Sequence, residues 1–451
     1  MSDMSGDDIE VARANFDQAY PRGYFAHRNA FAPDGKYGAW LFSKPMIVVV
    51  NDTAFVHGGL PPVVAESGIE AVNVDLLGDV RRYADQLQIL FDAQLLLPTD
   101  SNRDHVEIIS RMDTSMVTDP ALQQALADVE SLNDPLFSYQ SPHWYRGHTY
   151  CNPLVEGDRI DAALAKLGAS RVVVGHTPTP NRQVISRLGG RVIEVDTGMN
   201  NGYYRGSGHA LIIENGAITV VNERDMELGK PMPYARKVGS RPGRPISTAG
   251  LETLLRDGEI ITAADDMERL QIMYEGQPID VRFIKSPRKD IYPDVAAYRL
   301  DRALELNMVP VAVKREYDGD QGSLQFVPDD SMTETVRQQQ GIGGGAWCPL
   351  PVQWPSMSIF DALVANTARS TETLQYNLDT WEVLLTGFDQ SFTTSTTRPT
   401  YLRDGRIKVG NAWKEALKAL DDDTLQATFA DVLDKRRIKA LGKRRDYLLS
   451  L

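Results

Sequence analysis

Cysteine is scarce in this chain of 451 residues, and long apolar runs are absent. The two cysteines, Cys151 and Cys348, are far apart and in no metal-ligand spacing, which argues against a disulfide framework and against a zinc ribbon. No apolar run reaches the length of a membrane span, and the polar, acidic N-terminus lacks the profile of a secretory signal. We therefore expect a cytoplasmic protein in a reducing compartment.

Basic charge is also in short supply. The chain has 48 Lys and Arg against 61 Asp and Glu, a formal net charge of −13. This balance argues against general electrostatic binding to nucleic acid or to an anionic membrane, because binding to either needs clustered Lys and Arg. What is present, 42% apolar and 24% charged residues, is ordinary for a soluble globular protein, and the length predicts two or three domains.

Local patterns divide the chain into three parts. Residues 1–227 combine helical periodicity with short β-branched strands, among them "MIVVV", "TAFV" and "SRVVV", and predict an α/β domain. Residues 228–250 concentrate Pro, Gly, Arg and Ser without periodicity and read as a linker. Residues 251–451 restart the alternation of helices and strands and predict an α+β domain.

Two of the seven histidines, His57 and His176, each close a β-branched strand beside a glycine. Neutral imidazole is a good ligand for transition metals, and a neighbouring glycine lets a metal and its substrate approach the backbone. The alternative is that each is an ordinary turn histidine bound to a backbone carbonyl.

The segments around these histidines resemble a known family. "FVHGGLPP" is similar to the fourth signature block of calcineurin-like metallophosphoesterases of the serine/threonine-phosphatase type, in particular the bacterial Shewanella-like branch. "VVVGHTPTP" is similar to the fifth block, "VIEVDTGMNNGYYRGSGHALIIENG" to the stretch that follows it, and "SPHWYRG" to the family's tryptophan-tyrosine-arginine segment. The resemblance covers about residues 10–222, in the family's order.

The resemblance implies a β-sandwich flanked by helices, with two divalent metal ions (Mn, Fe or Zn) that activate a hydroxide to attack a phosphorylated substrate. By motif position, His57 and His176 would bind one metal. Arg146 would clamp phosphate oxygens as a catalytic residue, or else be a surface arginine beside two aromatic residues. Tyr203 and Asp196 would lie close to the phosphate, although Asp196 has the alternative role of ordering a turn.

The chain departs from this family in its first half. The three earlier blocks, which supply the remaining metal ligands and the acid for the leaving group, do not occur in the sequence. Residue 1 falls where the first half of the family fold should end, so we expect either a truncated product or a protein that has lost its catalytic half. Such an incomplete sandwich would expose a strand edge, which the absent half or a protein partner would complete. We expect weak activity or none, because the metal centre would be under-coordinated.

The second half resembles the small lobe of atypical kinases, in "IDVRFIK" and in the helix-then-"MVP" block that follows. In that family a strand lysine neutralises ATP phosphates and pairs with a carboxylate on the next helix. Lys285 matches the lysine, Asp294 stands where the family usually has Glu, and Asp389 matches the aspartate that holds magnesium. The resemblance therefore implies an ATP and magnesium site.

The catalytic block of this half is altered. In "VANTARSTETL", Ala368 stands at the position of the proton-accepting Asp and Thr373 at that of the metal-binding Asn, while Asn366 is retained. The segment 261–271, in the place of the family's glycine loop, contains no glycine. Alanine cannot accept a proton, so the resemblance indicates a pseudokinase. The alternative is an unrelated α+β domain in which Lys285 is a solvated strand residue.

Two hypotheses therefore follow from the sequence. In the first, the chain is a metal-dependent phosphoesterase, represented by its C-terminal half and fused to a kinase-like domain. In the second, it is a non-catalytic regulatory protein built from a degenerate phosphatase and a nucleotide-sensing pseudokinase. The residues do not specify the substrate, the metal or the oligomeric state.

Overall fold

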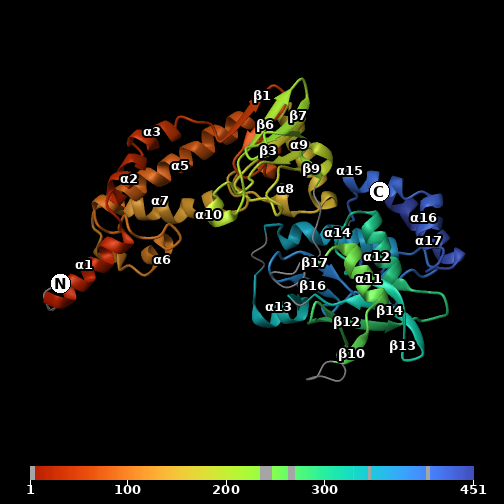
Figure 1. Ribbon diagram of the computed structural model, residues 1–451. Helices are drawn as coiled ribbons and strands as arrows, with labels where there is room; N and C mark the ends of the chain where they lie inside the picture. The colour runs from red at the N-terminus through yellow and green to blue at the C-terminus, as the bar shows by residue number, and fades with distance from the viewer. Residues whose placement is uncertain (1–5, 234–245, 263–269, 329, 344–346, 403–406) are drawn as a thin grey trace. The chain divides into compact units, whose positions relative to one another are not determined.

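The computed structural model describes residues 6–233, 246–262, 270–328, 330–343, 347–402 and 407–451, and shows a mixed α/β protein with several sheets and many helices (Figure 1). The chain divides into two compact units. Unit 1 comprises residues 1–145 and 163–174, and unit 2 comprises residues 146–162 and 175–451. The predicted linker at 228–250 falls inside unit 2, and the proposed boundary there stays a prediction.

Unit 1 is mainly helical, as the periodicity of residues 64–138 predicts. Its elements in chain order are α1 (Gly6–Ala19), α2 (Tyr24–Phe31), α3 (Lys36–Leu41), β1 (Ile47–Val50), β2 (Thr53–Val56), α4 (Pro62–Ser67), α5 (Ile69–Asp92), α6 (His105–Ser110), η1 (Thr114–Met116), α7 (Pro120–Phe137) and β3 (Arg171–Val174). The long helices α5 and α7 run side by side and enclose a core around Tyr83, Leu90 and Val129 (Figure 1). Asp128, buried on α7, accepts two hydrogen bonds from Arg82 on α5 and ties the pair together.

The strands of unit 1 bring its functional candidate to a strand end. β1 and β2 form an antiparallel hairpin, and β2 pairs in parallel with β3 in a register that sets Val56 against Val174. His57 follows β2 directly, as the sequence predicts. The amides of Gly58 and Gly59 both donate to the carbonyl of Pro142, at 3.1 and 2.9 Å. The two glycines therefore anchor this turn to the segment that precedes Arg146.

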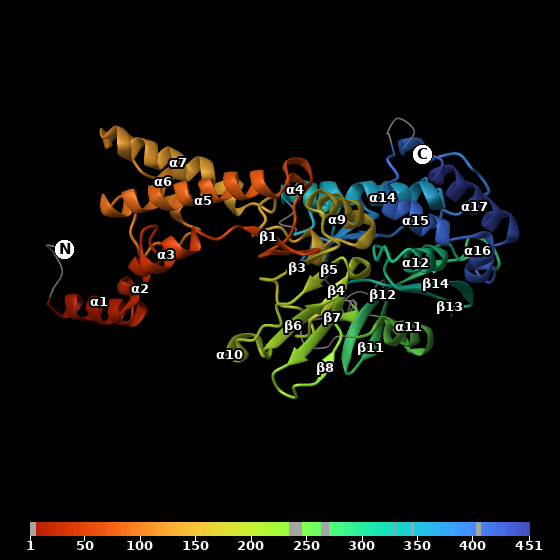
Figure 2. The same cartoon turned by 90° about the horizontal axis from the view of Figure 1, so that it is seen from above.

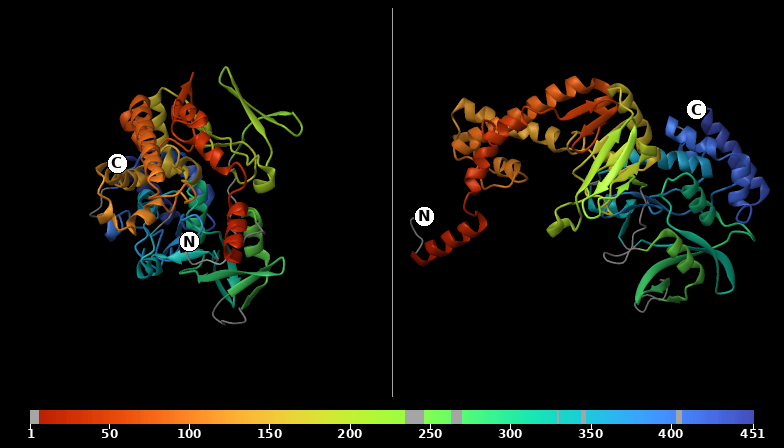
Figure 3. Two further views of the ribbon diagram at one scale, coloured as in Figure 1. Left: turned by 90° about the vertical axis from the view of Figure 1, so that its left-hand side faces the viewer. Right: turned by 45° about the horizontal axis from the view of Figure 1, so that its top comes forward.

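The first part of unit 2 contains short helices and two small groups of strands. Its elements are α8 (Gly147–Tyr150), most of α9 (Pro153–Leu167), β4 (Ile185–Arg187), η2 (Leu188–Gly190), β5 (Val192–Glu194), α10 (Asn201–Tyr204), β6 (His209–Glu214), β7 (Ala217–Asn222), β8 (Leu228–Gly229) and β9 (Met232–Pro233). An Asn-Gly pair between alternating apolar residues predicts a hairpin turn at Asn215 and Gly216. The structure confirms it: these residues have φ angles of 49° and 80° and join β6 to β7 (Figure 3). Only glycine adopts such a conformation without steric cost, and asparagine tolerates it.

The second part of unit 2 holds the remaining sheets and the C-terminal helices. Its elements are α11 (Thr248–Asp257), β10 (Ile260–Thr262), β11 (Leu270–Tyr274), β12 (Gln277–Lys285), α12 (Pro293–Ala303), β13 (Ala312–Tyr317), β14 (Asp320–Phe326), β15 (Ser331–Thr333), α13 (Glu334–Gln340), α14 (Leu350–Val364), β16 (Leu374–Asn377), β17 (Val383–Leu385), η3 (Thr400–Leu402), α15 (Asn411–Ala419), α16 (Asp422–Phe429) and α17 (Lys435–Leu449). The predicted helices and strands between 251 and 327 are thereby confirmed as elements.

One antiparallel sheet of this part has the order β10-β11-β12-β14-β13, and its two faces differ. Val281, Phe283 and Leu324 share an apolar face because side chains alternate along a strand, and α11 packs against β13 and β14 (Figure 2). Arg282 and Gln325 are directly paired on the other, more polar face.

The structure contradicts one expectation drawn from cysteine content. Cys151 and Cys348 form a disulfide across 197 residues of sequence, and both are about 2% exposed. Nothing in the sequence indicated this bond, because residues that are far apart in the sequence can be close together in a folded domain. The expectation of a reducing compartment loses this support, and the cytoplasmic location stays a prediction. Among the helices in the described ranges, none has the length and apolar character needed to cross a membrane.

Candidate functional site

The loop that joins α14 to β16, residues 365–373, is held in place by a buried ion pair. Asp361, near the end of α14, is fully buried, and the side chain of Arg369 is only 4% exposed. The Nε and Nη2 atoms of Arg369 each donate to one carboxylate oxygen of Asp361 at 2.8 Å. This two-point contact fixes the direction of the planar guanidinium, and with it the course of the loop.

The same loop is tied to the segment that follows β17. Arg369 Nη1 donates to the carbonyls of Thr373 and Thr386, at 2.7 and 2.6 Å. The buried amide of Asn366 donates to the carbonyl of Gly387 at 3.3 Å. These bonds bring together the two stretches that the sequence analysis assigned to the catalytic and magnesium-binding blocks.

Ala368 lies within this rigid loop. Its amide donates to the Asn366 side chain at 2.9 Å, so the backbone position is set by the retained asparagine. Thr373 caps the turn locally, since its hydroxyl accepts the amide of Ser370 at 2.9 Å. The methyl group of Ala368 therefore lies at the position that the resemblance gives to a proton acceptor. The hydroxyl of Thr373, at the position of a metal ligand, is engaged in a local hydrogen bond.

Asp294, in the first turn of α12, reaches the segment after β17. It is 1% exposed, and its Oδ1 accepts a hydrogen bond from the amide of Phe388 at 3.4 Å. Its Oδ2 has no hydrogen-bond partner within the described part of the chain. Burial raises the pKa of Asp294, the amide of Phe388 and the charge of Arg282 lower it, and the charge of Asp389 raises it, which together bring the pKa from 3.8 to about 6. Asp294 and Asp389, which the resemblance assigns to one nucleotide site, are thus close enough for the charge of Asp389 to act on Asp294.

Lys285 does not belong to this arrangement. Its side chain is 67% exposed and pairs with Asp320 of β14 at 2.6 Å. The expected ion pair between Lys285 and Asp294 is therefore wrong in this structure. Lys285 and Arg282 are three residues apart on β12 and therefore lie on opposite faces of the sheet, and the charge of Arg282 lowers the pKa of Asp294.

Sequence reasoning did not single out Arg282 or the role of Asp361. Arg282 could have been considered from strand alternation alone, because residues 282 and 285 lie on opposite faces of a strand and only one of these two cations can face the site. A signal for Asp361 is its position as a lone acid in the apolar helix end "SIFDALVA", where a buried charge requires a partner. Arg369, eight residues later, is that partner.

The raised pKa of Asp294 predicts a pH-dependent stability. The folded protein keeps the Asp294 proton after the unfolded chain has lost it, so this stabilisation is complete below about pH 3.8 and is lost as the pH rises through about 6. Asp294→Asn removes the titrating group. We expect the stability difference between wild type and Asp294→Asn to change by about 3 kcal/mol across this window. Urea unfolding at several pH values measures it.

The control for this experiment is Asp379→Asn, at an exposed turn between β16 and β17. This substitution removes an exposed carboxylate that lies outside the surroundings of Asp294. A difference between wild type and Asp294→Asn that stays constant from pH 4 to pH 7 would contradict the assignment of a raised pKa to Asp294.

The first part of unit 2 brings three of the predicted phosphatase residues into one neighbourhood. Arg146 is 2% exposed, and its guanidinium lies 5.4 Å from the ring centre of Trp347. Burial lowers the pKa of His176, the charge of Arg146 lowers it further, and the charge of Asp196 raises it. The imidazole is thereby kept neutral, the form that binds metals. His176 also has a positive φ of 63° at its strand end.

Asp196 and Tyr203 have local structural contacts. Asp196 accepts the amide of Gly198 at 2.9 Å, so the alternative in which it orders a turn has direct support. Tyr203 lies on α10 with 75% exposure and contacts the ring of Tyr204. Its role as a phosphate ligand stays a prediction.

The predicted two-metal centre is not assembled by the described residues. His57 belongs to unit 1 and His176 to unit 2. Within the ranges that the structure describes, no three or more His, Cys, Asp or Glu side chains gather in a way that could hold a metal ion. The described residues therefore do not supply the donor set of a dinuclear centre. The segment 263–269 of the glycine-free loop lies outside the described residues.

Comparison with known proteins adds little to this geometry. No family model matches the chain, and no curated protein matches it. Among solved structures, the chain is similar to the crystal structure of a Helicobacter pylori proinflammatory kinase, CtkA. The sequences are 10% identical, the match covers 44% of this chain and 93% of the other, and the TM-score is 0.29. A TM-score this low carries no argument about function.

Proposed function

We propose that the chain is a non-catalytic regulatory protein whose C-terminal part binds a nucleotide without transferring its phosphate. The observation that carries this proposal is the loop 365–373. Its scaffold is complete, because Asp361, Asn366 and Arg369 hold it against the segment after β17. Its proton-accepting position is Ala368, which cannot activate a hydroxyl group.

The residues around Asp294 fit a magnesium ion carried by a nucleotide. Magnesium in such sites takes one or two carboxylates together with phosphate oxygens. Asp389 is an exposed carboxylate, and the free Oδ2 of Asp294 is a buried one beside it. Arg282 on β12 supplies positive charge to the same site. When bound, the ion would neutralise the phosphates; the carboxylates of Asp294 and Asp389 would hold it, and Arg282 would attract the phosphate oxygens.

A thermal unfolding experiment tests nucleotide binding. Magnesium and ATP at several times the dissociation constant are expected to raise the melting temperature of wild type by about 3 °C, since a ligand that binds only the folded state stabilises it. Asp389→Asn should abolish the rise because it removes the exposed carboxylate. Asp379→Asn, an exposed aspartate outside the site, should retain it.

Two results would overturn this proposal. An unchanged melting temperature at millimolar ATP would exclude the nucleotide site. Production of ADP above that of the Asp389→Asn protein would exclude the non-catalytic assignment, because it would require a proton acceptor that replaces Ala368.

A second candidate function, hydrolysis of a phosphomonoester or phosphoprotein, is favoured by the shared neighbourhood of Arg146 and His176. Burial lowers the pKa of Arg146, which means that the buried cation is destabilised and that a bound phosphate would offset this cost. In this hypothesis the divalent metal (Mn, Fe or Zn) needs ligands from a partner or from an N-terminal half that completes the sheet.

Turnover of p-nitrophenyl phosphate with added manganese tests this second function. We expect no metal-dependent turnover by the chain alone, but weak binding of inorganic phosphate that falls about tenfold in Arg146→Lys, since lysine cannot form a two-point contact. Arg205→Lys, at an exposed turn after α10, is the matched control. Metal-dependent turnover that is lost in His176→Ala would instead establish the chain as a phosphoesterase.

A further inference from the structure

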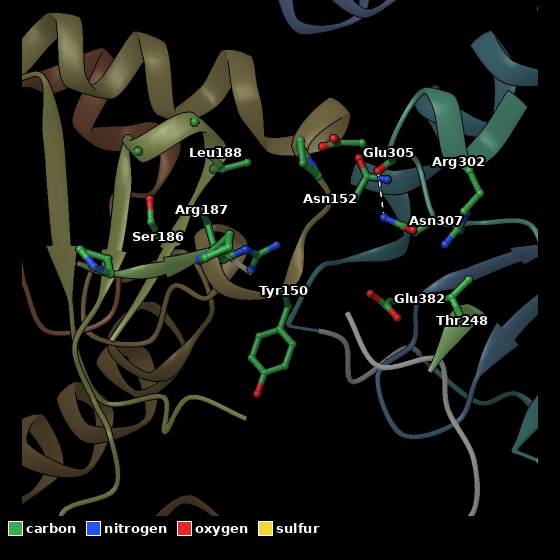
Figure 4. Close-up of a pocket in the computed structure, with 15 residues that line it drawn as sticks. Tyr150, Asn152, Ser186, Arg187, Leu188, Thr248, Arg302, Glu305, Asn307 and Glu382 are labelled. Carbon is green, nitrogen blue, oxygen red and sulfur yellow. Dashed lines mark hydrogen bonds between the residues drawn. The ribbon is translucent and has the colours of Figure 1, made fainter. Parts of the chain in front are cut away.

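A cavity of about 670 Å³ lies where the first and second parts of unit 2 meet (Figure 4). All of its described lining residues belong to unit 2, so the cavity is internal to one compact part of the chain. One wall is formed by β4 and η2, and another by the end of α12 and the residue that precedes β17. Its volume is in the range of cavities that bind small organic molecules.

The walls of this cavity are held together by a covalent bond, a hydrogen bond and a shared core. The disulfide between Cys151 and Cys348 joins the two parts of unit 2. Asn152, which lines the cavity, donates through Nδ2 to the carbonyl of Leu306. Leu154 is buried in the same apolar core as Leu306. The cavity is therefore preformed, and a ligand does not have to order its walls.

Arg187, the last residue of β4, places a buried cation in one wall. Its side chain is 4% exposed, and its Nη2 donates to the carbonyl of Cys151 at 3.0 Å. Glu194 of β5, also buried, is its carboxylate partner, but the distance from Arg187 Nη1 to Glu194 Oε1 is 3.6 Å. This distance is longer than a hydrogen bond, so the direction of the guanidinium is fixed while its ion pair is loose.

Glu194 neutralises the charge of Arg187 only in part at neutral pH. Burial raises the pKa of Glu194, and the charge of Arg187 and a hydrogen bond with Thr149 lower it, which together bring the pKa to about 7. Glu194 is therefore protonated in about half of the molecules at pH 7. A buried guanidinium without a full counter-charge is unfavourable, and an anionic ligand group beside Arg187 offsets this cost.

The opposite wall of the cavity is acidic. Glu305, which follows α12, and Glu382, which precedes β17, both line it, and Figure 4 shows them across the cavity from Arg187. Glu305 is exposed and has no ion pair within the described ranges. Arg302 also lines this wall, but its guanidinium is bound to the fully buried Asp301. This wall therefore favours a positively charged group.

The cavity is separate from the nucleotide candidate. Asp294 lies in the first turn of α12 and Arg302 in its last turn, which places them about 12 Å apart along the helix axis. Asp294 and Asp389 are not among the described residues that line the cavity. A ligand bound here is thus independent of nucleotide binding, and neither proposal depends on the other.

We propose that this cavity binds a short peptide, with its terminal carboxylate at Arg187 and its terminal ammonium group at Glu305 and Glu382. A ligand that carries one charge of each sign matches both walls, whereas a simple anion would be repelled by the two glutamates. The cavity is larger than a single amino acid and suits a peptide of a few residues. The rings of Tyr150 and Pro153, which also line it, supply apolar surface for the peptide side chains.

Isothermal titration calorimetry of the full chain at pH 7 with trialanine and two blocked forms of it tests this proposal. Trialanine carries both terminal charges, N-acetyl-trialanine only the carboxylate, and trialanine amide only the ammonium group. We expect trialanine to bind, and each blocked peptide to bind at least about fivefold more weakly, because each loses one ion pair. No binding of trialanine at millimolar concentrations, or equal affinity for all three peptides, would overturn the proposal.

The variant Glu305→Gln tests the acidic wall at an exposed position where the substitution should not disturb folding. It should weaken the binding of trialanine about threefold and leave that of N-acetyl-trialanine unchanged, since the acetylated peptide has no ammonium group to lose. Glu259→Gln, at an exposed position outside the cavity, is the matched control. An equal effect of Glu305→Gln on both peptides would contradict the proposed orientation.

The variant Glu194→Gln tests the basic wall without removing Arg187. The neutral amide has nearly the same shape as the carboxyl group but no longer competes for the guanidinium. At pH 8, where most of Glu194 in wild type is ionised, N-acetyl-trialanine should bind Glu194→Gln at least about twofold more tightly than wild type. Unchanged or weaker binding by a variant with wild-type circular dichroism would exclude Arg187 as the carboxylate site.

Discussion

Replacing Asp361 with Ala is expected to lower the free energy of unfolding by about 3–5 kcal/mol, because it leaves the charge of Arg369 buried without its carboxylate. Arg369 is held by two bonds to Asp361 and two to backbone carbonyls, and it has no route to solvent without moving the loop 365–373. The hydroxyl of Tyr401, which donates to Asp361 at 2.6 Å, loses its acceptor as well. Urea unfolding of wild type and variant measures the difference.

The matched control for this experiment is Glu415→Ala, which breaks the exposed ion pair between Glu415 and Lys418. Both side chains of that pair are more than half exposed, so its loss should cost less than about 1 kcal/mol. If Asp361→Ala costs no more than Glu415→Ala, then Arg369 finds another partner and the loop is not anchored as described. ATP-dependent stabilisation should also be lost in Asp361→Ala, since the loop and the segment before Asp389 share Arg369.

Replacing both cysteines with Ser is expected to lower the free energy of unfolding by about 5 kcal/mol, measured by urea unfolding in the absence of reductant. The reason lies in the unfolded chain, where the bond between Cys151 and Cys348 closes a loop across a sequence separation of 197. Removing this constraint raises the entropy of the unfolded state, and the loss grows slowly with loop length.

Wild type unfolded in the presence of a reductant is the control for the cysteine variant. The two should have the same urea midpoint, because both lack the bond while all other contacts are retained. An oxidised wild type whose midpoint equals that of the variant would show that the disulfide does not form in the protein in solution.

Much of the local structure could be predicted from the sequence. The alternation of apolar residues around Asn215-Gly216 predicts the β6–β7 hairpin, and the structure places the turn at those residues. The helices and strands between residues 251 and 327 likewise follow from the periodicity of that stretch. These features depend on neighbours in the chain, which a sequence states directly.

Contacts between distant segments could not be predicted in the same way. Lys285 and Asp294 were expected to pair because of a resemblance, yet the turn that joins β13 to β14 places Asp320 beside Lys285. Cys151 and Cys348 were expected to stay apart because of their spacing, yet they are bonded. In both cases the packing of the fold determines which side chains are neighbours. The number of residues between two positions in the sequence does not reveal this.

The sequence by itself thus determined the order of helices and strands, the position of His57 and His176 at strand ends, and the substitution of Ala368 in the loop 365–373. These properties follow from residue identity and short-range periodicity. The tertiary structure decided that Asp294 meets Asp389, that Asp361 holds Arg369, and that one disulfide links the surroundings of Arg146 to α14. The physical reason is that burial and packing bring residues together that are distant in the sequence. The pKa of Asp294, the ion pair of Arg369 and the pairing of the two cysteines all depend on such neighbours.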